Sequence, residues 1–424
     1  MNNPSLFIPS HPPARASKRH KVSTSMLQFS LFSLLIGLAQ IAAAGDLRLS
    51  GFGSLSLSCF SNDQADYVIN LQPVGPGRTG QCDAGLDSTI GVQADLRFNE
   101  SLEFGVQTVV DRNVDRGFDP DTTVVQLRWH LYDDTTVRVG RSPASPFLYS
   151  ETRMVKFVMP WIRPPMEVYG ISPTFTQDGV EVLHNLFVND WKLEWQAGLS
   201  EAHPTTPVGT NQTRRANTSQ AFINFSLESS DTLVKLGYNM GRVTLDQDSV
   251  TLISNTLRSV GAGTPQAQLA DELPLADSDV HLLSFGVRHE TADWFIQGEA
   301  AYRTMEGYFR DQLGAYLSIG KHSGSWTPYL TVARRTTSGP DTDSRAGALT
   351  ATVDSLLAAT RFDSTSLAIG VSRELNDQAT VKLQVDWIKP DKDSWGLYTN
   401  HGPSYDYATP DTDILISVGV DFVF

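Results

Sequence analysis

Few residues of this chain have the types and spacing that catalysis requires. Seven histidines follow residue 44, and none lies in an H-E-x-x-H or a G-x-S-x-G context. The sequence also has no phosphate loop, metal-ligand cluster or nucleotide motif. We interpret these histidines as structural or interfacial: His130, His184, His203, His281, His289, His322 and His401.

The segment Tyr149–Gly170, YSETRMVKFVMPWIRPPMEVYG, mixes charged and large apolar side chains. Its three prolines remove backbone donors and fix φ, so it is predicted to be neither a regular helix nor a central strand. It is also too apolar for an unpacked surface loop. The prolines stiffen the segment, and its charged side chains are available for contacts: Glu151, Arg153, Lys156, Arg163 and Glu167.

The first 44 residues have the pattern of a secretory signal peptide. Four basic residues precede an apolar run that begins near Met26 and ends in Ala42–Ala44. We therefore predict a mature chain over 45–424, although Met26 is an alternative start. Removal of the leader moves the formal net charge from −14 to −18. No later window approaches the roughly 18 uninterrupted apolar residues of a membrane helix.

Alternation of polar and apolar residues dominates the mature chain. In the last strand Ile414, Ile416, Val418 and Val420 share one phase. Sixteen strands are expected, over 46–58, 87–98, 101–111, 122–132, 135–141, 178–187, 190–200, 219–228, 231–241, 279–290, 293–303, 310–321, 325–334, 361–373, 379–389 and 412–424.

Short and long connectors alternate between these strands. The pattern predicts antiparallel hairpins with short turns at one end and long loops at the other, as in an all-β transmembrane barrel. Such a barrel closes on itself, which satisfies every backbone polar group in lipid. Trp191, Trp294 and Trp326 each follow a short turn, where rings prefer the water–lipid boundary.

The phase opposite the apolar one is rich in charged and small polar residues. A sixteen-stranded barrel is wide enough for an aqueous channel, so these residues are expected to line a wet interior. Many acidic residues fall instead in the long loops, where solvation of exposed loops is the simple interpretation. Cys59 and Cys82 are expected to pair if the chain reaches an oxidising compartment; two unpaired thiols are the alternative.

Two stretches resemble Gram-negative outer-membrane porins: the mature start D-L-R-L-S-G-F-G-S-L-S-L-S and the end D-I-L-I-S-V-G-V-D-F-V-F, with Phe424 last. The resemblance implies a homotrimer in the outer membrane, in contact with its lipid. It implies passive diffusion of small hydrophilic solutes or ions. We expect no cofactor, metal or nucleic acid. It also implies that the barrel-assembly machinery reads the C-terminal strand.

In such porins the third long loop folds inward and narrows the channel, and here that connector is 142–177. The resemblance places Glu151, Glu167 and Asp178 opposite wall arginines, which would create a transverse field. The loop is itself basic at Arg153, Lys156 and Arg163, which favours anions. The implied wall arginines are Arg48, Arg97, Arg128 and Arg138.

Other interpretations remain open. The loop P-W-I-R-P-P-M-E-V-Y departs from the family motif, so a substrate-specific channel is one alternative. A barrel hydrolase with a Ser–His pair at its rim is another, and a structural or adhesive barrel is a third. The loop could also lie over the rim or cover a subunit contact.

Overall fold

A computed structural model describes residues 46–69, 72–114, 117–172, 174–209 and 212–424. The predicted signal peptide over 1–44 lies outside these residues. Sixteen strands of nine to sixteen residues account for most of the described chain. They are β1 (Asp46–Phe60), β4 (Thr89–Asn99), β5 (Leu102–Asp111), β6 (Pro120–Tyr132), β7 (Thr135–Pro143), β8 (Thr176–Val188), β9 (Trp191–Ala202), β12 (Asn217–Glu228), β13 (Thr232–Leu245), β14 (Leu275–Glu290), β15 (Trp294–Met305), β16 (Asp311–Lys321), β17 (Trp326–Ser338), β18 (Ser364–Asn376), β19 (Ala379–Pro390) and β21 (Asp413–Val423).

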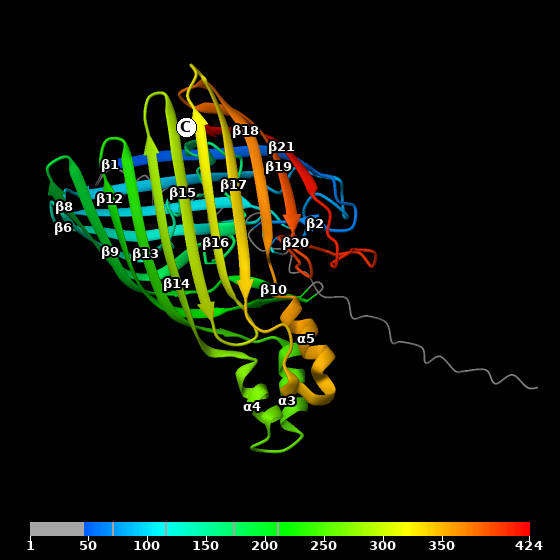
Figure 1. Cartoon of the computed structure of the whole chain (residues 1–424). Helices are drawn as coiled ribbons and strands as arrows, with labels where there is room; N and C mark the ends of the chain where they lie inside the picture. Colours follow the sequence, from blue (N-terminus) through cyan, green and yellow to red (C-terminus); the bar gives the residue numbers. More distant parts are fainter. Residues whose placement is uncertain (1–45, 70–71, 115–116, 173, 210–211) are drawn as a thin grey trace, which may run out of the picture. The chain divides into compact units, whose positions relative to one another are not determined.

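These strands form one closed antiparallel barrel. Neighbours in sequence pair with each other, and β1 pairs with β21, from Phe52 opposite Val423 to Phe60 opposite Leu415. The predicted sixteen-stranded all-β barrel is therefore confirmed, with strand ends shifted by a few residues. Figure 1 shows the strands β12 to β17 side by side along one wall.

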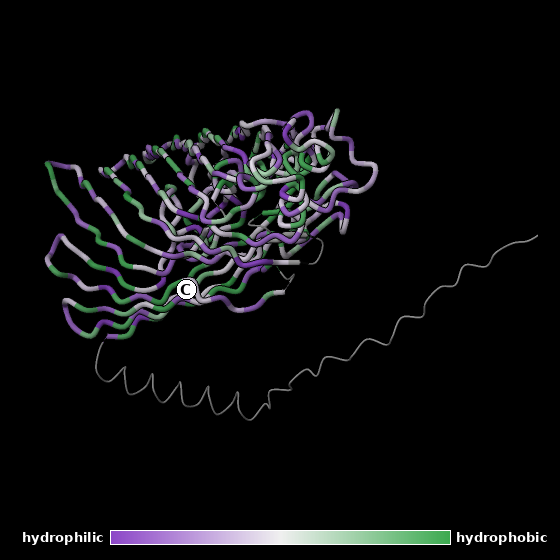
Figure 2. The backbone as a smooth tube through the Cα atoms, turned by 90° about the horizontal axis from the view of Figure 1, so that it is seen from below, coloured by the Kyte–Doolittle hydropathy of each residue, from purple (hydrophilic) through white to green (hydrophobic). Residues whose placement is uncertain are grey.

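The two faces of the barrel wall differ in polarity, as the alternation predicts. In β21 the side chains of Ile416 and Val418 are exposed, whereas Ser417 and Asp421 are buried inside. Figure 2 shows hydrophobic and hydrophilic residues alternating along the strands. The first residues of β9, β15 and β17 are the exposed Trp191, Trp294 and Trp326. An apolar outer band with aromatic edges is typical of barrels that face lipid.

Short elements within the long connectors were not predicted. Among the described residues, no helix is long and apolar enough to cross a membrane. Figure 1 shows α3, α4 and α5 gathered near one end of the barrel. The short elements are β2 (Asp66–Tyr67), β3 (Cys82–Asp83), η1 (Lys156–Val158), α2 (Met166–Tyr169), β10 (Thr205–Gly209), β11 (Gln212–Arg215), α3 (Asp248–Arg258), α4 (Pro265–Glu272), η2 (Ser344–Leu349), α5 (Thr350–Ala358) and β20 (Tyr398–Thr399).

Two of these elements connect loops to the barrel. The strand β2 pairs with β20, which joins the first long connector to the last. The strand β3 pairs with the end of β1, and Cys59 and Cys82 of this pair form a disulfide with an S–S distance of 1.99 Å. The first long connector is therefore attached to the barrel through β3 and to the last long connector through β2.

Candidate functional site

The connector between β7 and β8, residues 144–175, is called the third loop below. Side chains of the inner wall hold its backbone. Lys235 of β13 and Arg303 of β15 donate hydrogen bonds to carbonyl oxygens of this loop at 3.0 and 2.8 Å. Lys382 of β19 donates to three further carbonyl oxygens at 2.7 to 3.1 Å. The third loop thus lies against the inner face of the barrel rather than over its rim.

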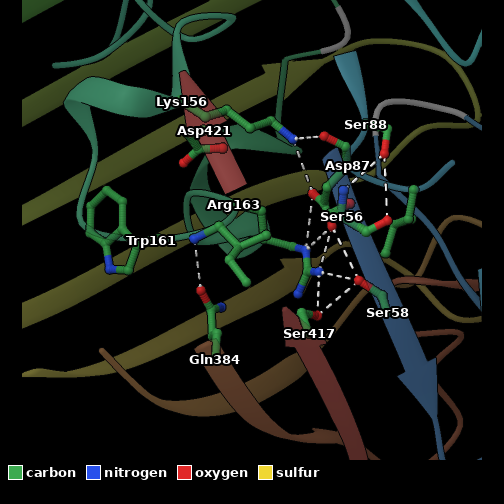
Figure 3. Close-up of polar contacts among 12 residues, drawn as sticks. Ser56, Ser58, Asp87, Ser88, Lys156, Trp161, Arg163, Gln384, Ser417 and Asp421 are labelled. Carbon is green, nitrogen blue, oxygen red and sulfur yellow. Dashed lines mark hydrogen bonds and ion pairs between the residues drawn. The ribbon is translucent and has the colours of Figure 1, made fainter. Parts of the chain in front are cut away.

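Arg163 anchors the loop to the closure of the barrel. Its Nε lies 3.0 Å from Asp87 Oδ2, and its Nη1 lies 3.1 Å from Asp386 Oδ2. Its Nη2 donates to the hydroxyls of Ser58 and Ser417 at 2.9 and 2.6 Å. These partners come from β1, β19, β21 and the segment before β4. Figure 3 shows the guanidinium pointing towards Asp87, Ser58 and Ser417.

The charges of this anchor are buried and mutually stabilising. Arg163 is only 4% exposed. Burial opposes ionisation, but the carboxylates of Asp87 and Asp386 outweigh it and raise the pKa of Arg163. Burial likewise opposes ionisation of Asp87, yet Arg163 and Lys156 hold the pKa of Asp87 below its ordinary value. Removal of either charge would leave an uncompensated ion inside the protein.

Aromatic packing fixes the middle of the loop. The ring of Trp161 meets those of Tyr149 and Tyr316 edge-on, with centroids 5.7 and 5.5 Å apart. Its Nε1 donates to Thr331 Oγ1 of β17 at 2.9 Å. Two of the three prolines directly precede α2, whose N-cap is Pro165. A short helix entered through prolines has little freedom to leave the wall.

A buried carboxylate holds the two ends of the loop together. Glu299 of β15 accepts hydrogen bonds from the Leu148 backbone N–H at 2.8 Å and from the Tyr169 hydroxyl at 2.6 Å. The Tyr316 hydroxyl donates to the same carboxylate at 2.8 Å. All of its contacts are donors, so the carboxylate is well satisfied within the wall.

Glu151 is the loop carboxylate that turns back to β7, the strand that leads into the loop. Its side chain is 43% exposed, and its Oε1 lies 3.2 Å from Arg138 Nη1 of β7. Arg138 also contacts Glu181 of β8 at 3.2 Å. The loop therefore contacts β7 at Glu151 and, through Trp161, the strand β17. Because β7 and β17 lie half of the barrel apart in the strand order, the loop spans the interior.

The wall beside Glu151 carries charges of both signs. Arg128 of β6 lies 3.0 Å from both Asp95 and Glu103, on β4 and β5. These side chains retain partial exposure inside the barrel. Charges in a water-filled passage influence ions directly, whereas the total charge of the protein does not decide selectivity.

Three of the five predicted loop residues do not face the passage. Arg163 and Glu167, the latter 3% exposed, are packed against the wall, and burial raises the pKa of Glu167. Lys156 lies 3.3 Å from Asp87. The expectation that these side chains face a solute was wrong, because Asp87 and Asp386 hold the two cations and Glu167 is buried in the short helix α2. The anion preference argued from the loop loses its basis.

The remaining predicted residues do not form one row of opposed charges. The Arg153 guanidinium lies over the Phe175 ring at 4.1 Å, and burial lowers its pKa to about 10. Asp178 pairs with its neighbour Arg141 at 2.8 Å rather than standing opposite the wall arginines. Arg97 and Arg48 are exposed, Arg48 on the part of β1 that precedes its pairing with β21.

Sequence reasoning missed the acidic residues that hold the third loop against the barrel wall. Asp386 and Glu299 were recognisable as inward-facing from their phase, but their partners in the loop were not. Asp87 stands at the start of a predicted strand and carried no signal. Among the described residues, no group of three or more His, Cys, Asp or Glu could hold a metal ion.

Comparison with solved structures identifies the architecture. The anion-selective porin from Comamonas acidovorans superposes with a TM-score of 0.55 and 10% identity, over 90% of this chain and 100% of that chain. The outer membrane channel DcaP of Acinetobacter baumannii gives 0.54 and 10%, over 90% and 98%. The fold is that of the porins.

A third porin-fold structure, Salmonella typhi OmpF in complex with daunomycin, gives a TM-score of 0.52 and 11% identity, over 90% of this chain and 99% of that chain. No profile of a known protein family matches this porin-fold chain. A search of curated proteins also finds no match. At such low identity the shared property is the barrel, and the roles of individual residues rest on the contacts described above.

Proposed function

We propose that this chain is an outer-membrane porin that lets small hydrophilic solutes and ions diffuse passively through its barrel. The observation that carries the proposal is the third loop, which spans the interior and holds the exposed Glu151 beside Arg138. A closed barrel with an apolar outer face and a polar inner wall needs such a segment only if the interior is a passage. We propose no enzymatic activity and no cofactor.

Further parts of the proposal concern the setting of the protein. The apolar outer band and the fold shared with outer-membrane channels support a Gram-negative outer membrane, reached through the predicted signal peptide. The homotrimer and recognition of the strand ending at Phe424 by the barrel-assembly machinery follow from the resemblance. Chemical crosslinking of the purified protein tests the trimer, because a monomeric barrel yields no three-chain product.

Selectivity tests whether Glu151 faces the passage. Replacing Glu151 with glutamine removes one negative charge from that site, and the cation-to-anion permeability ratio should fall. A unit charge about 4 Å from an ion in water is worth about 1 kcal/mol, so a change of about fivefold is expected. The measurement is the reversal potential of the purified protein in a planar bilayer under a salt gradient.

The buried Glu167 provides the matched control. The variant Glu167→Gln makes the same chemical change in the same loop but away from the passage, so its reversal potential should equal that of the wild type. Equal shifts in both variants, or none in either, would contradict the placement of Glu151. Swelling of proteoliposomes in arabinose separately tests diffusion of a neutral solute.

A further inference from the structure

A cavity of 340 Å³ lies beside the third loop at the long-loop end of the barrel. Its walls come from β12 to β17, from the third loop with α2 and from the connectors that carry β2 and β20. Cavities of this size accept a small organic molecule. Its lining includes apolar side chains such as Leu282, Met305, Phe309, Phe362 and Leu397.

The charged side chains that line this cavity are positive. Among the described residues that line it, Arg303 and Arg335 are the only charged ones. They are 7% and 3% exposed. Within the described part of the chain, neither guanidinium has a carboxylate within 4.0 Å, although most other buried cations of the barrel do. Two buried positive charges without a nearby counter-ion are unfavourable unless an anion joins them.

Both guanidinium groups keep unused hydrogen-bond donors. Arg303 Nη1 donates to the Ile171 carbonyl at 2.8 Å, and Arg335 Nη2 donates to Gln312. In the described part of the protein, Nε and Nη2 of Arg303 and Nε of Arg335 have no partner. Gln312 also stands directly opposite Arg303 in the β15–β16 register, which places the two arginines close together.

Neighbouring acids do not satisfy these donors. Asp363 accepts hydrogen bonds from Arg361 at 2.9 Å and from the Thr337 backbone N–H at 2.6 Å. Asp311 accepts from the Met305 backbone N–H at 3.3 Å. Burial raises the pKa of Glu167, and its carboxylate forms no ion pair with Arg303 or Arg335. None of these three acids therefore pairs directly with the unused donors in the described part of the chain.

Aromatic rings sit against both arginines. The Arg335 Cζ lies 5.1 Å from the centroid of Phe362, and the Arg303 Cζ lies 5.9 Å from that of Phe309. The rings shield the guanidinium groups from water and line the same space. A ligand that fills the cavity must therefore offer an anionic end to the arginines and an apolar body to the remaining wall.

We propose that this cavity is a binding site for a monocarboxylate with an aromatic or similarly compact apolar body. The carboxylate accepts hydrogen bonds from Arg303 and Arg335, since a planar carboxylate matches the geometry of a guanidinium. The body packs against Phe309, Phe362 and Leu397. The proposal rests on the proposed channel function. It adds a class of substrate that binds in this cavity before it passes the third loop.

Benzoate is the probe, with benzyl alcohol as its uncharged analogue and acetate as an anion without the apolar body. Calorimetry on the full-length barrel in detergent should detect benzoate binding at least about tenfold tighter than either analogue. Inorganic phosphate should bind no better than acetate. Equal binding of benzoate and benzyl alcohol, or no binding of benzoate, would overturn the proposal without any variant.

Two glutamine variants locate the site. Arg335→Gln should weaken benzoate binding by about tenfold or more, because a charge-assisted hydrogen bond is lost. Arg334→Gln changes the preceding residue, which points away from the cavity and pairs with Asp391, and should leave binding within about twofold. Unchanged binding in Arg335→Gln would overturn the assignment. Arg335→Lys keeps the charge and should recover part of the affinity.

Conductance in a planar bilayer separates this proposal from the channel function. Ion current that benzoate leaves unchanged, together with no calorimetric signal, would reject the cavity and retain the porin. Benzoate binding by a protein that carries no current would reject the diffusion channel and retain the cavity. Benzoate that both binds and transiently blocks the current is the expected result.

Discussion

Replacing Arg163 with methionine is expected to release the third loop from the barrel wall. The change removes the cation between Asp87 and Asp386, whose carboxylates are buried. Breaking a buried pair in this way costs about 3–5 kcal/mol, and we expect the lower end because Lys156 still contacts Asp87. A cost of 3 kcal/mol raises the population of the undocked loop by more than about a hundredfold.

Single-channel conductance in a planar bilayer measures this release. The Arg163→Met variant should show larger and noisier current steps than the wild type, because the loop no longer holds one position. The double variant Arg163→Met, Asp386→Asn leaves Asp87 paired with Lys156 and should restore quieter steps, since neither carboxylate of the anchor then lacks a partner. Wild-type conductance in the single variant would refute the reasoning, and so would equal disturbance in both variants.

Three other outcomes are expected. The pKa of Asp87 is lowered from its ordinary value of 3.8. The contribution of its charge to docking of the third loop is therefore complete above pH 3.8 and is lost as the pH falls further. Current noise should rise on acidification below pH 3.8 and not between pH 7 and 5. Burial beside Trp395 and Tyr405 lowers the pKa of His401 from 6.5 to about 4, so the hydrogen-exchange protection factors over 393–408 should fall as pH falls from 6.5 towards 4. A His401→Phe variant that keeps this dependence would contradict the assignment. Reduction of the Cys59–Cys82 disulfide should cost about 3 kcal/mol by the chain-entropy estimate, and an unchanged denaturation midpoint under reducing conditions would argue against it.

The barrel was readable from the sequence because its signal repeats in every strand. Alternation such as Ile414, Ile416, Val418 and Val420 arises from a wall with lipid on one side and water on the other. The division into short and long connectors follows from the same geometry. The helix α3 carried a weaker signal, with Val250, Ile253 and Leu257 on one face, but it is short and lies in a loop dominated by polar residues.

The docking of the third loop was not readable in the same way. Phase shows that Asp386 points inward, but it does not show that Arg163, more than two hundred residues earlier in the chain, is its partner. Long-range ion pairs depend on where the loop lies once the barrel has closed. For the same reason the sequence did not distinguish the exposed Glu151 from the buried Glu167, which are similar in type and in context.

The current carried by the purified wild-type protein in a planar bilayer tests the central claim most directly. The protein must first show the heat-modifiable migration of a folded barrel. We predict steady ion-conducting steps and a reversal potential that responds to Glu151→Gln. A folded barrel that carries no current would contradict a diffusion passage bounded by the third loop.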